Sequence, residues 1–198
     1  MGTKIWALGI SAAAVLALVS GCAQLPGKAD SASTSTASEA EAPEPLYEWQ
    51  GDGRRISLIT IDTDRQEAEF YDGDERIGWA KVATGINHWE TPHGRFTITE
   101  KLVEKSSGSY GNVYDDQGRL KIVNAKRGVH RIPAGGHFEG AEMPYWMRLT
   151  SSGVGIHGGP IPDPGIPASH GCIRLPETLA PIVFAHTRVG TPVRIVGS

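Results

Sequence analysis

The pattern of apolar and polar positions divides the chain into three stretches. Residues 5–20 form an apolar run without an ionisable side chain, whereas residues 22–45 are dominated by Ala, Ser, Thr, Glu and Pro. Apolar residues recur with a regular period only beyond this point. We therefore predict a single folded domain over residues 46–198, a length sufficient for one hydrophobic core.

Within this domain, apolar residues often alternate with polar ones, as they do in half-buried β-strands. Residues 55–61 alternate in this way, and residues 67–71 and 75–83 flank a glycine-containing turn that is typical of a β-hairpin. Further strands are expected at 95–101, 120–124, 145–150 and 191–196, a helix at 176–186, and a loop or cap over the candidate site at 104–118. The predicted fold class is mainly β, a sandwich with one or two short helices and a loop cap.

Composition and charge narrow the possible functions. The chain has 25 glycines and 13 prolines, which favours a loop-rich β protein over a helix bundle. Its net charge is −3 and it contains no basic run, so we do not expect a nucleic-acid partner.

The N-terminal stretch is typical of a targeting segment. Lys4 precedes the apolar run, which ends in small residues before Cys22, so residues 1–21 are predicted to be a signal peptide. The cysteine in this position resembles that of a bacterial lipobox, which predicts lipidation of Cys22 and membrane attachment through the lipid. An ordinary signal peptide or an uncleaved anchor is the alternative.

Residues 22–45 would then be a disordered tether that holds the domain off a membrane. The expected location is periplasmic and lipid-anchored. Ala23 favours the outer membrane, because an Asp there would favour retention in the inner membrane.

Cys172 is the candidate nucleophile of the domain. If Cys22 is lipidated, Cys172 has no intramolecular disulfide partner, although the compartment oxidises thiols. A buried inert thiol is the alternative, but polar and glycine-rich neighbours favour a catalytic thiol that a histidine base activates. The intervening proline-rich residues 160–167 cannot be helical and are expected to form a stiff loop that carries His157 back over Cys172.

The order of residues around this cysteine resembles the signature of the L,D-transpeptidase (YkuD-type) family. That signature is a histidine, a short gap, Ser/Thr-His-Gly-Cys, a hydrophobic residue and Asn or Arg. The chain fills it with His157, Ser169-His170-Gly171-Cys172, Ile173 and Arg174. Residues 91–98 and 143–149 are also similar to segments of the family, and the resemblance extends over about residues 55 to 198.

Chemistry and resemblance together assign roles to these residues. Cys172 is the nucleophile and His157 is the base that takes its proton, giving a thiolate–imidazolium pair. The resemblance implies that the carbonyl of Gly158 holds the other ring nitrogen of His157. Backbone N–H groups around Gly171 and Cys172 are expected to stabilise the oxyanion.

The remaining site residues are expected to support this chemistry or to bind substrate. Ser169 and His170 are expected to support the loop or the substrate. Arg174 is assigned either to a substrate carboxylate or to an ordinary surface charge. Tyr145 and Trp146 are predicted to line the substrate groove.

The resemblance implies action on peptidoglycan and a function in cell-wall biogenesis and cell shape. The thiolate would attack the meso-diaminopimelate carbonyl of a tetrapeptide stem and release D-alanine. The acyl group would pass to an amine, which gives a 3→3 cross-link or anchors an outer-membrane lipoprotein. The resemblance also implies that carbapenems acylate the cysteine. Neither a cofactor nor a metal is required for this chemistry.

Three alternatives remain open from the sequence. Water as the acceptor would make the protein an L,D-carboxypeptidase or another murein hydrolase. His157, His170 and Cys172 are also zinc-ligand types, as in a zinc-dependent peptidase. The third alternative is a non-catalytic wall-binding lipoprotein.

Overall fold

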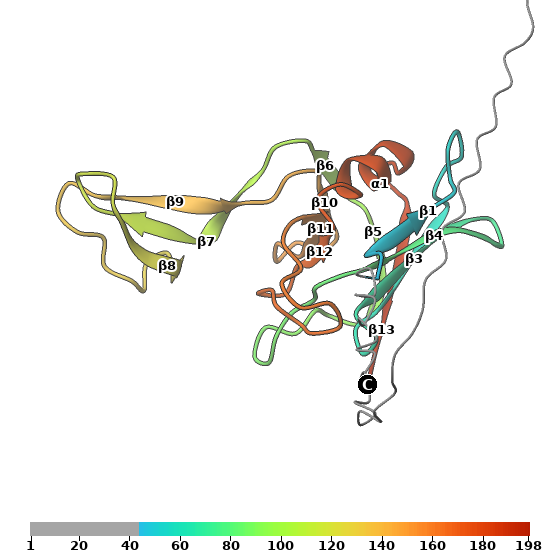
Figure 1. Cartoon of the computed structure of the whole chain (residues 1–198), viewed down its shortest axis with the longest axis horizontal. Coiled ribbons are helices and arrows are strands. Elements are labelled where there is room, and N and C mark those ends of the chain that lie inside the picture. Colours follow the sequence, from blue (N-terminus) through green and yellow to red (C-terminus); the bar gives the residue numbers. More distant parts are fainter. Residues whose placement is uncertain (1–43) are drawn as a thin grey trace, which may run out of the picture. The chain divides into compact units, whose positions relative to one another are not determined.

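The computed structural model describes residues 44–198, which contain thirteen strands and one helix (Figure 1). The elements are β1 Tyr47–Trp49, β2 Leu58–Asp62, β3 Glu67–Asp72, β4 Glu75–Lys81, β5 Gly94–Thr97, β6 Glu100–Leu102, β7 Ser106–Tyr114, β8 Leu120–Lys126, β9 His137–Glu142, β10 Trp146–Arg148, β11 Gly155–Gly158, β12 Ile173–Leu175, α1 Ala180–His186 and β13 Pro192–Val196. The mainly β class is thus confirmed.

Part of the sequence-based prediction lies outside the described residues. This part comprises the signal peptide, the lipidation of Cys22 and nearly all of the tether. Residues 44–198 contain no helix with the length and hydropathy needed to span a membrane.

The first sheet has six strands in the order β1-β4-β3-β2-β13-β5. β3 and β4 pair antiparallel across a turn in which Gly73 has φ +63°, which confirms the predicted hairpin. β13 pairs parallel with β2 and antiparallel with β5, so that the last strand of the chain lies inside the sheet. Ile59 and Ile61 are buried and alternate with half-buried residues, so β2 has the period of two expected of a strand.

The second sheet has four strands in the order β12-β11-β10-β6, and α1 packs against β11. Its buried residues Ile156, Ile173 and Leu175 belong to the same apolar cluster as Ile59 and Phe70 of the first sheet. The two sheets therefore share one core, as in a sandwich.

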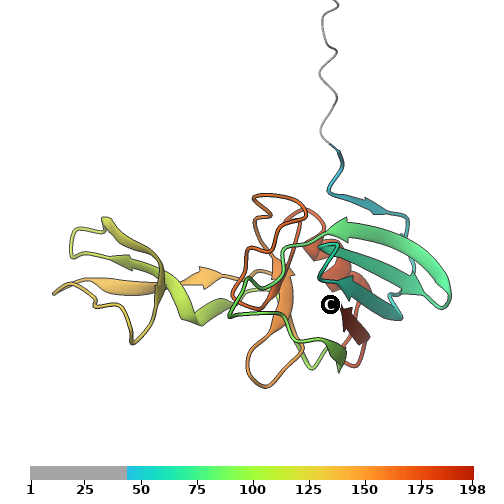
Figure 2. The ribbon, with the colours of Figure 1, turned by 90° about the horizontal axis from the view of Figure 1, so that it is seen from below.

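The third sheet, with the order β8-β7-β9, corrects the prediction of a loop over residues 104–118. Glycines in this region mark close strand packing and not irregular backbone. A Cβ on Gly111 would lie 1.9 Å from the Glu139 carbonyl oxygen, and one on Gly140 would lie 2.1 Å from that of Ser107. In both ribbon views the strands of the second sheet lie between the first and the third sheet (Figure 1, Figure 2).

Two other predicted elements differ from the observed ones. The strand expected at residues 95–101 is divided, because the chain leaves the first sheet after β5 and enters the second at β6. Ile98, at the crossing, is fully buried. The helix begins at Ala180 and not at residue 176, which places Pro181 in its first turn, where no amide hydrogen bond is lost.

Candidate active site

The parallel pairing of β11 with β12 brings the candidate base and nucleophile together. His157 is in register with Arg174, and Ile156 is in register with Ile173. Because side chains alternate along a strand, Ile156 and Ile173 enter the core while His157 and Arg174 share the opposite face. Cys172 directly precedes β12 and lies two residues before Arg174, so it belongs to the same face.

The prediction of a loop between the two strands is confirmed: residues 160–167 contain no helix or strand. Gly159 follows β11, and its N–H donates to the carbonyl of Leu175 at 3.1 Å. The loop therefore begins against the end of β12 and returns to the nucleophile at Ser169.

The environment of His157 determines which ring nitrogen carries its proton. The side chain is 6% exposed, and its Nδ1 lies 2.8 Å from the carbonyl oxygen of Gly158. A carbonyl only accepts hydrogen bonds, so Nδ1 is the protonated nitrogen of the neutral ring and Nε2 has a free lone pair. The carbonyl of Gly158 thus makes the contact that the family resemblance implied.

Burial determines the charge state of the two candidate catalytic groups. Burial and the nearby Arg174 lower the pKa of His157 to about 4, against the opposing effect of its hydrogen bond to Gly158. Burial raises the pKa of the Cys172 thiol, although a backbone hydrogen bond from Gly155 and the charge of Arg174 oppose this shift. The resting pair at neutral pH is therefore a thiol and a neutral imidazole.

Both groups are thus neutral at rest, and the thiolate–imidazolium pair expected from the sequence stays a prediction for the reaction with substrate. The Cys172 Sγ lies 3.7 Å from the carbonyl oxygen of Gly153, to which a protonated thiol can donate. Without substrate, neither charge is compensated well enough to offset the cost of its burial. The proton transfer to His157 consequently belongs to the attack step.

Two buried hydroxyl groups hold the backbone of the nucleophile loop. Ser169 Oγ donates to the Cys172 carbonyl and accepts from the Gly171 N–H at 3.1 Å. Thr91 Oγ1 donates to the Gly171 carbonyl at 3.0 Å and accepts from the Gly85 N–H at 2.9 Å. Gly171 has φ +103°, which a residue with a Cβ rarely adopts.

These contacts refine the predicted oxyanion site. The Gly171 N–H is already bonded to Ser169 and is not free to bind an oxyanion. Among the residues that the structure describes, none accepts a hydrogen bond from the N–H of Cys172 or of His170. These two amides are therefore the available donors near the nucleophile.

Gln66 supports the nucleophile loop through Thr84, a role that was not expected from the sequence. This fully buried side chain donates to Thr84 Oγ1 and to the Thr63 carbonyl, both at 2.6 Å, and accepts from the Thr84 N–H at 2.8 Å. The Thr84 carbonyl in turn accepts from the Ser169 N–H at 2.9 Å. A glutamine in a polar turn carries no sequence signal for such a role.

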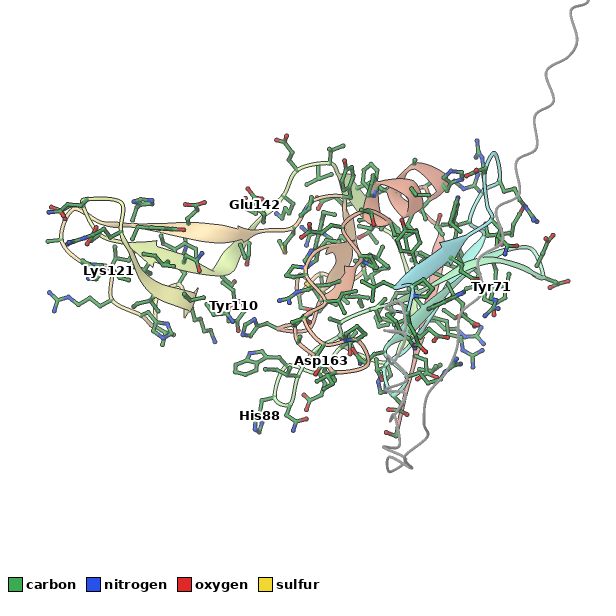
Figure 3. All side chains as sticks on the ribbon, viewed as in Figure 1. Tyr71, His88, Tyr110, Lys121, Glu142 and Asp163 are labelled. Carbon is green, nitrogen blue, oxygen red and sulfur yellow. The ribbon has the colours of Figure 1, made fainter. Side chains whose placement is uncertain are left out.

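His170 lies between two aromatic side chains, and one of them, Tyr110, was not expected at the site. Its ring stacks on Tyr110 of β7, with centroids 4.1 Å apart and planes at 8°. Trp89 meets the same ring edge-on at 5.2 Å. Burial, with a smaller effect of Arg174, lowers the pKa of His170. Tyr110 lies at the end of the third sheet that faces the rest of the domain (Figure 3).

A cavity of about 410 Å³ opens over the candidate nucleophile. Its lining includes Ser107–Tyr110 of β7, Glu142 and Met143, Ser152–Val154, and His157, Ser169, His170, Cys172 and Arg174. Arg174 Nη1 donates to the Pro160 carbonyl at 3.4 Å and forms no ion pair within residues 44–198. An unpaired guanidinium beside the thiol can bind a carboxylate.

Tyr145 and Trp146 were both predicted to line the substrate groove, but only Trp146 borders the cavity. The prediction for Tyr145 is wrong, because the residue is not part of the cavity lining and packs against Phe184 at 5.7 Å. Its φ of +57° turns the backbone immediately before β10. Trp146 borders the cavity but is only 1% exposed, and its Nε1 donates to Glu100 at 3.0 Å. It forms a wall beside His157, 6.2 Å away between ring centroids.

The arrangement does not favour a zinc site. Within residues 44–198, no three His, Cys, Asp or Glu side chains are grouped so that they could hold a metal ion. His170, one of the three possible ligands, is stacked between Tyr110 and Trp89. The site has the parts of a thiol–imidazole acyl-transfer centre.

Comparison with known proteins identifies related sequences and folds. The family model YkuD, L,D-transpeptidase catalytic domain, matches residues 56–195. No curated protein sequence matches the chain.

Several solved structures have a similar fold. An L,D-transpeptidase from Mycobacterium smegmatis is 22% identical over 70% of this chain and 58% of its own, with a TM-score of 0.53. A cysteine-to-serine mutant of Enterococcus faecium L,D-transpeptidase is 21% identical over 72% of this chain and 50% of its own, with a TM-score of 0.52. An imipenem complex of an L,D-transpeptidase, LdtMt1, is 23% identical over 70% of this chain and 58% of its own, with a TM-score of 0.52. The chain thus spans between half and three fifths of these relatives.

Proposed function

Because the chain belongs to the YkuD family of L,D-transpeptidase catalytic domains, we propose that it is a peptidoglycan L,D-transpeptidase with Cys172 as its nucleophile. The observation that carries the proposal is the arrangement on β11 and β12. A thiol and a histidine base share one face, and the base is fixed by the carbonyl of Gly158.

The proposed acylation proceeds by proton transfer and attack. Nε2 of His157 takes the thiol proton as Sγ of Cys172 attacks the meso-diaminopimelate carbonyl of a tetrapeptide stem. The N–H groups of Cys172 and His170 stabilise the oxyanion. The carbon–nitrogen bond to D-alanine then breaks, the leaving amine takes the proton from His157, and a thioester remains on Cys172.

The thioester then passes to an amine. Neutral His157 accepts a proton from the attacking amine, the new amide forms, and the thiolate leaves and recovers the proton from the imidazolium. A diaminopimelate amine as the acceptor gives a 3→3 cross-link, and a lysine of an outer-membrane lipoprotein gives an anchored wall. Water as the acceptor is the second candidate, which would make the protein an L,D-carboxypeptidase or another murein hydrolase on the same site.

Arg174 is proposed to hold a carboxylate of the stem peptide. Its guanidinium borders the cavity next to Cys172 and has no acidic partner in the described part of the chain. A fixed positive charge there also favours the thiolate that develops during attack, because it lowers the pKa of the thiol.

The proposed setting is the periplasm, with the domain tethered through a lipid on Cys22. The support for this part is the sequence pattern of residues 1–45, in which an apolar run ends in Gly21-Cys22 and a polar stretch follows. A tether of this composition lets the domain reach the wall from a membrane surface.

The test is mass spectrometry of tetrapeptide muropeptides incubated with the enzyme. A cross-linked dimer would identify the transpeptidase, a trimmed tripeptide the carboxypeptidase, and a D-amino-acid exchange product an amine-transfer activity of broader acceptor range. In every case Cys172→Ser should abolish turnover while the domain remains folded. Normal turnover by Cys172→Ser would refute the proposed mechanism.

Trapping of the acyl-enzyme provides an independent check. A solved relative is an imipenem complex, and another is an avibactam carbamoyl enzyme. We expect imipenem to add its mass to the wild type and not to Cys172→Ala. A folded wild type that forms no adduct would favour the non-catalytic wall-binding alternative.

A further inference from the structure

The segment Arg119–Ile132 differs in charge from the rest of the chain. It contains five Lys or Arg residues and no Asp or Glu, whereas the whole chain carries a net charge of −3. The segment comprises β8 and the first part of the loop that leads to β9. We refer to it as the basic strip.

Three cations of the basic strip are free for an external partner. Arg119 is paired with Asp115 at 2.8 Å, and the guanidinium of Arg127 lies over the ring of Phe138 at 4.4 Å. The other three, Lys121, Lys126 and Arg131, are exposed and take part in no ion pair among residues 44–198. Lys121 lies at the end of the third sheet away from the other two sheets (Figure 3).

The basic strip also exposes aliphatic side chains to water. The exposed fractions are 49% for Leu120, 67% for Val123, 68% for Val129 and 40% for Ile132. Large apolar side chains that are exposed together and flanked by charges mark surfaces that bind a partner or a membrane. Four of the ten large apolar residues exposed in the described domain fall within these fourteen positions.

The basic strip lies almost entirely outside the cavity that contains the candidate catalytic residues. β8 is an edge strand of the third sheet, and of the strip only Asn124 borders the cavity. None of the free cations or of the exposed aliphatic residues lines this cavity. Their arrangement therefore needs an explanation other than acyl transfer.

We propose that the basic strip binds the surface of an anionic phospholipid bilayer. Lys and Arg are attracted to anionic headgroups, and aliphatic side chains gain free energy when they enter the acyl-chain boundary. The strip contains no Trp, Tyr or Phe on which the sugar rings of a glycan could stack. The combination of unpaired cations with Leu, Val and Ile thus fits a lipid surface better than it fits murein.

The consequence for the molecule is a second, reversible membrane contact on the third sheet. A basic patch with exposed apolar side chains adds to the membrane affinity of a lipid-anchored protein. The contact would orient the third sheet, and with it the cavity, relative to the membrane. The inference does not depend on the acyl-transfer activity.

The test measures partition of the full chain onto vesicles of phosphatidylcholine, with and without phosphatidylglycerol. The test variant is Lys121→Gln/Lys126→Gln/Arg131→Gln. Its matched control, Arg55→Gln/Arg95→Gln/Arg188→Gln, removes the same charge from exposed arginines that also lack ion pairs among residues 44–198. The N-terminal stretch is the same in all proteins, so its own lipid affinity cancels in the comparison.

We expect the test variant to lose binding to the phosphatidylglycerol vesicles on the order of 100-fold, and the control to lose much less. Added salt should also weaken the binding of the wild type to these vesicles, because it screens the attraction between the cations and the headgroups. The apolar part is tested with Val123→Ser/Val129→Ser, which should bind less at every salt concentration than the control Val189→Ser/Ile166→Ser. All of these variants should keep the wild-type rate of acylation by imipenem.

Three results would overturn the proposal. One is equal binding of test variant and control to the anionic vesicles. Another is a loss of binding to purified murein sacculi without a loss on vesicles, which would make the strip a wall-binding surface. The third is concentration-dependent self-association that the test variant abolishes without any change in vesicle binding.

Discussion

Burial keeps His157, the candidate base, in its neutral form. Its pKa of about 4 means that the imidazole is neutral, and able to accept a proton, across the range in which an exposed histidine titrates. The carbonyl of Gly158 fixes the tautomer, so no acidic side chain is needed to orient the ring. Arg174 contributes in the same direction, because its positive charge disfavours the imidazolium.

The pH dependence of acylation should reveal this low pKa. Acylation by imipenem needs neutral His157, so its rate constant should fall only as the pH decreases through about 4, and not through 6.5, the ordinary pKa of a histidine. The measurement is the second-order rate constant across this range, with circular dichroism to verify folding. His170→Asn should keep the same acid limb, and an acid midpoint near 6.5 in the wild type would contradict the assigned environment.

The same residue should make the fold sensitive to acid. The pKa of His157 is depressed in the folded state, so between pH 6.5 and 4 the unfolded chain binds the additional proton. The contribution of His157 to the free energy of unfolding is complete above pH 6.5 and decreases as the pH falls to about 4. Below that pH it no longer changes, and the total loss is about 3 kcal/mol. Urea unfolding at several pH values should show a weaker acid dependence for His157→Gln, whereas an unchanged slope would refute this account.

At the scale of elements, the nucleophile loop is held by parts of the chain that are distant in sequence. Ser169 and Thr91 satisfy the backbone on both sides of Gly171, and Gln66 holds Thr84 behind them. Buried polar groups with all their hydrogen bonds made give a rigid backbone, which positions the Cys172 and His170 amides in advance.

Gly85 marks the tightest approach in this frame. A Cβ there would lie 1.9 Å from the Trp89 carbonyl oxygen and 2.9 Å from Cα of Gly171. We expect Gly85→Ala to lower the Tm by roughly 10 °C, because backbone must move to relieve the clash. Gly108→Ala is the matched control, since a Cβ added at Gly108 would have no atom within 4 Å, and it should melt close to the wild type. Equal melting temperatures would show that the contact is not tight in solution.

At the scale of the whole domain, the third sheet meets the catalytic face through the ring of Tyr110. Tyr110 comes from β7 and stacks on His170, two residues from the nucleophile. Tyr114, further along the same strand, stacks in the same way on His137 of β9, with centroids 5.2 Å apart and planes at 15°. The two stacks are similar in chemistry, but only the first one joins the third sheet to the site.

This difference predicts separate effects of two similar substitutions. Tyr110→Ala and Tyr114→Ala should both lower the Tm slightly, but only Tyr110→Ala should slow acylation by imipenem, by roughly threefold to tenfold. Tyr110→Phe keeps the ring and should restore the rate, which distinguishes stacking from a contact of the hydroxyl. If Tyr114→Ala slows acylation as much, the stack on His170 has no special role in positioning the loop.

The sequence alone determined the parts of this protein that depend on local chemistry and short-range periodicity. The order His157, Ser169-His170-Gly171-Cys172 and Arg174 identified the candidate chemistry, and the alternation in β2, β3 and β4 predicted the strands of the first sheet. These features are local, because residue type and spacing of two specify which side chains share a face.

Only the tertiary structure decided the features that depend on distant contacts. The glycines of β7 and β9 indicate a loop in the sequence, but they permit two backbones to pack closely in a sheet. The sequence pointed to Tyr145 as a cavity residue and not to Tyr110, whereas the turn before β10 excluded the first and the stack on His170 included the second. The charge state of Cys172 and His157 was decided in the same way, because desolvation depends on everything that surrounds a group and not on its neighbours in the chain.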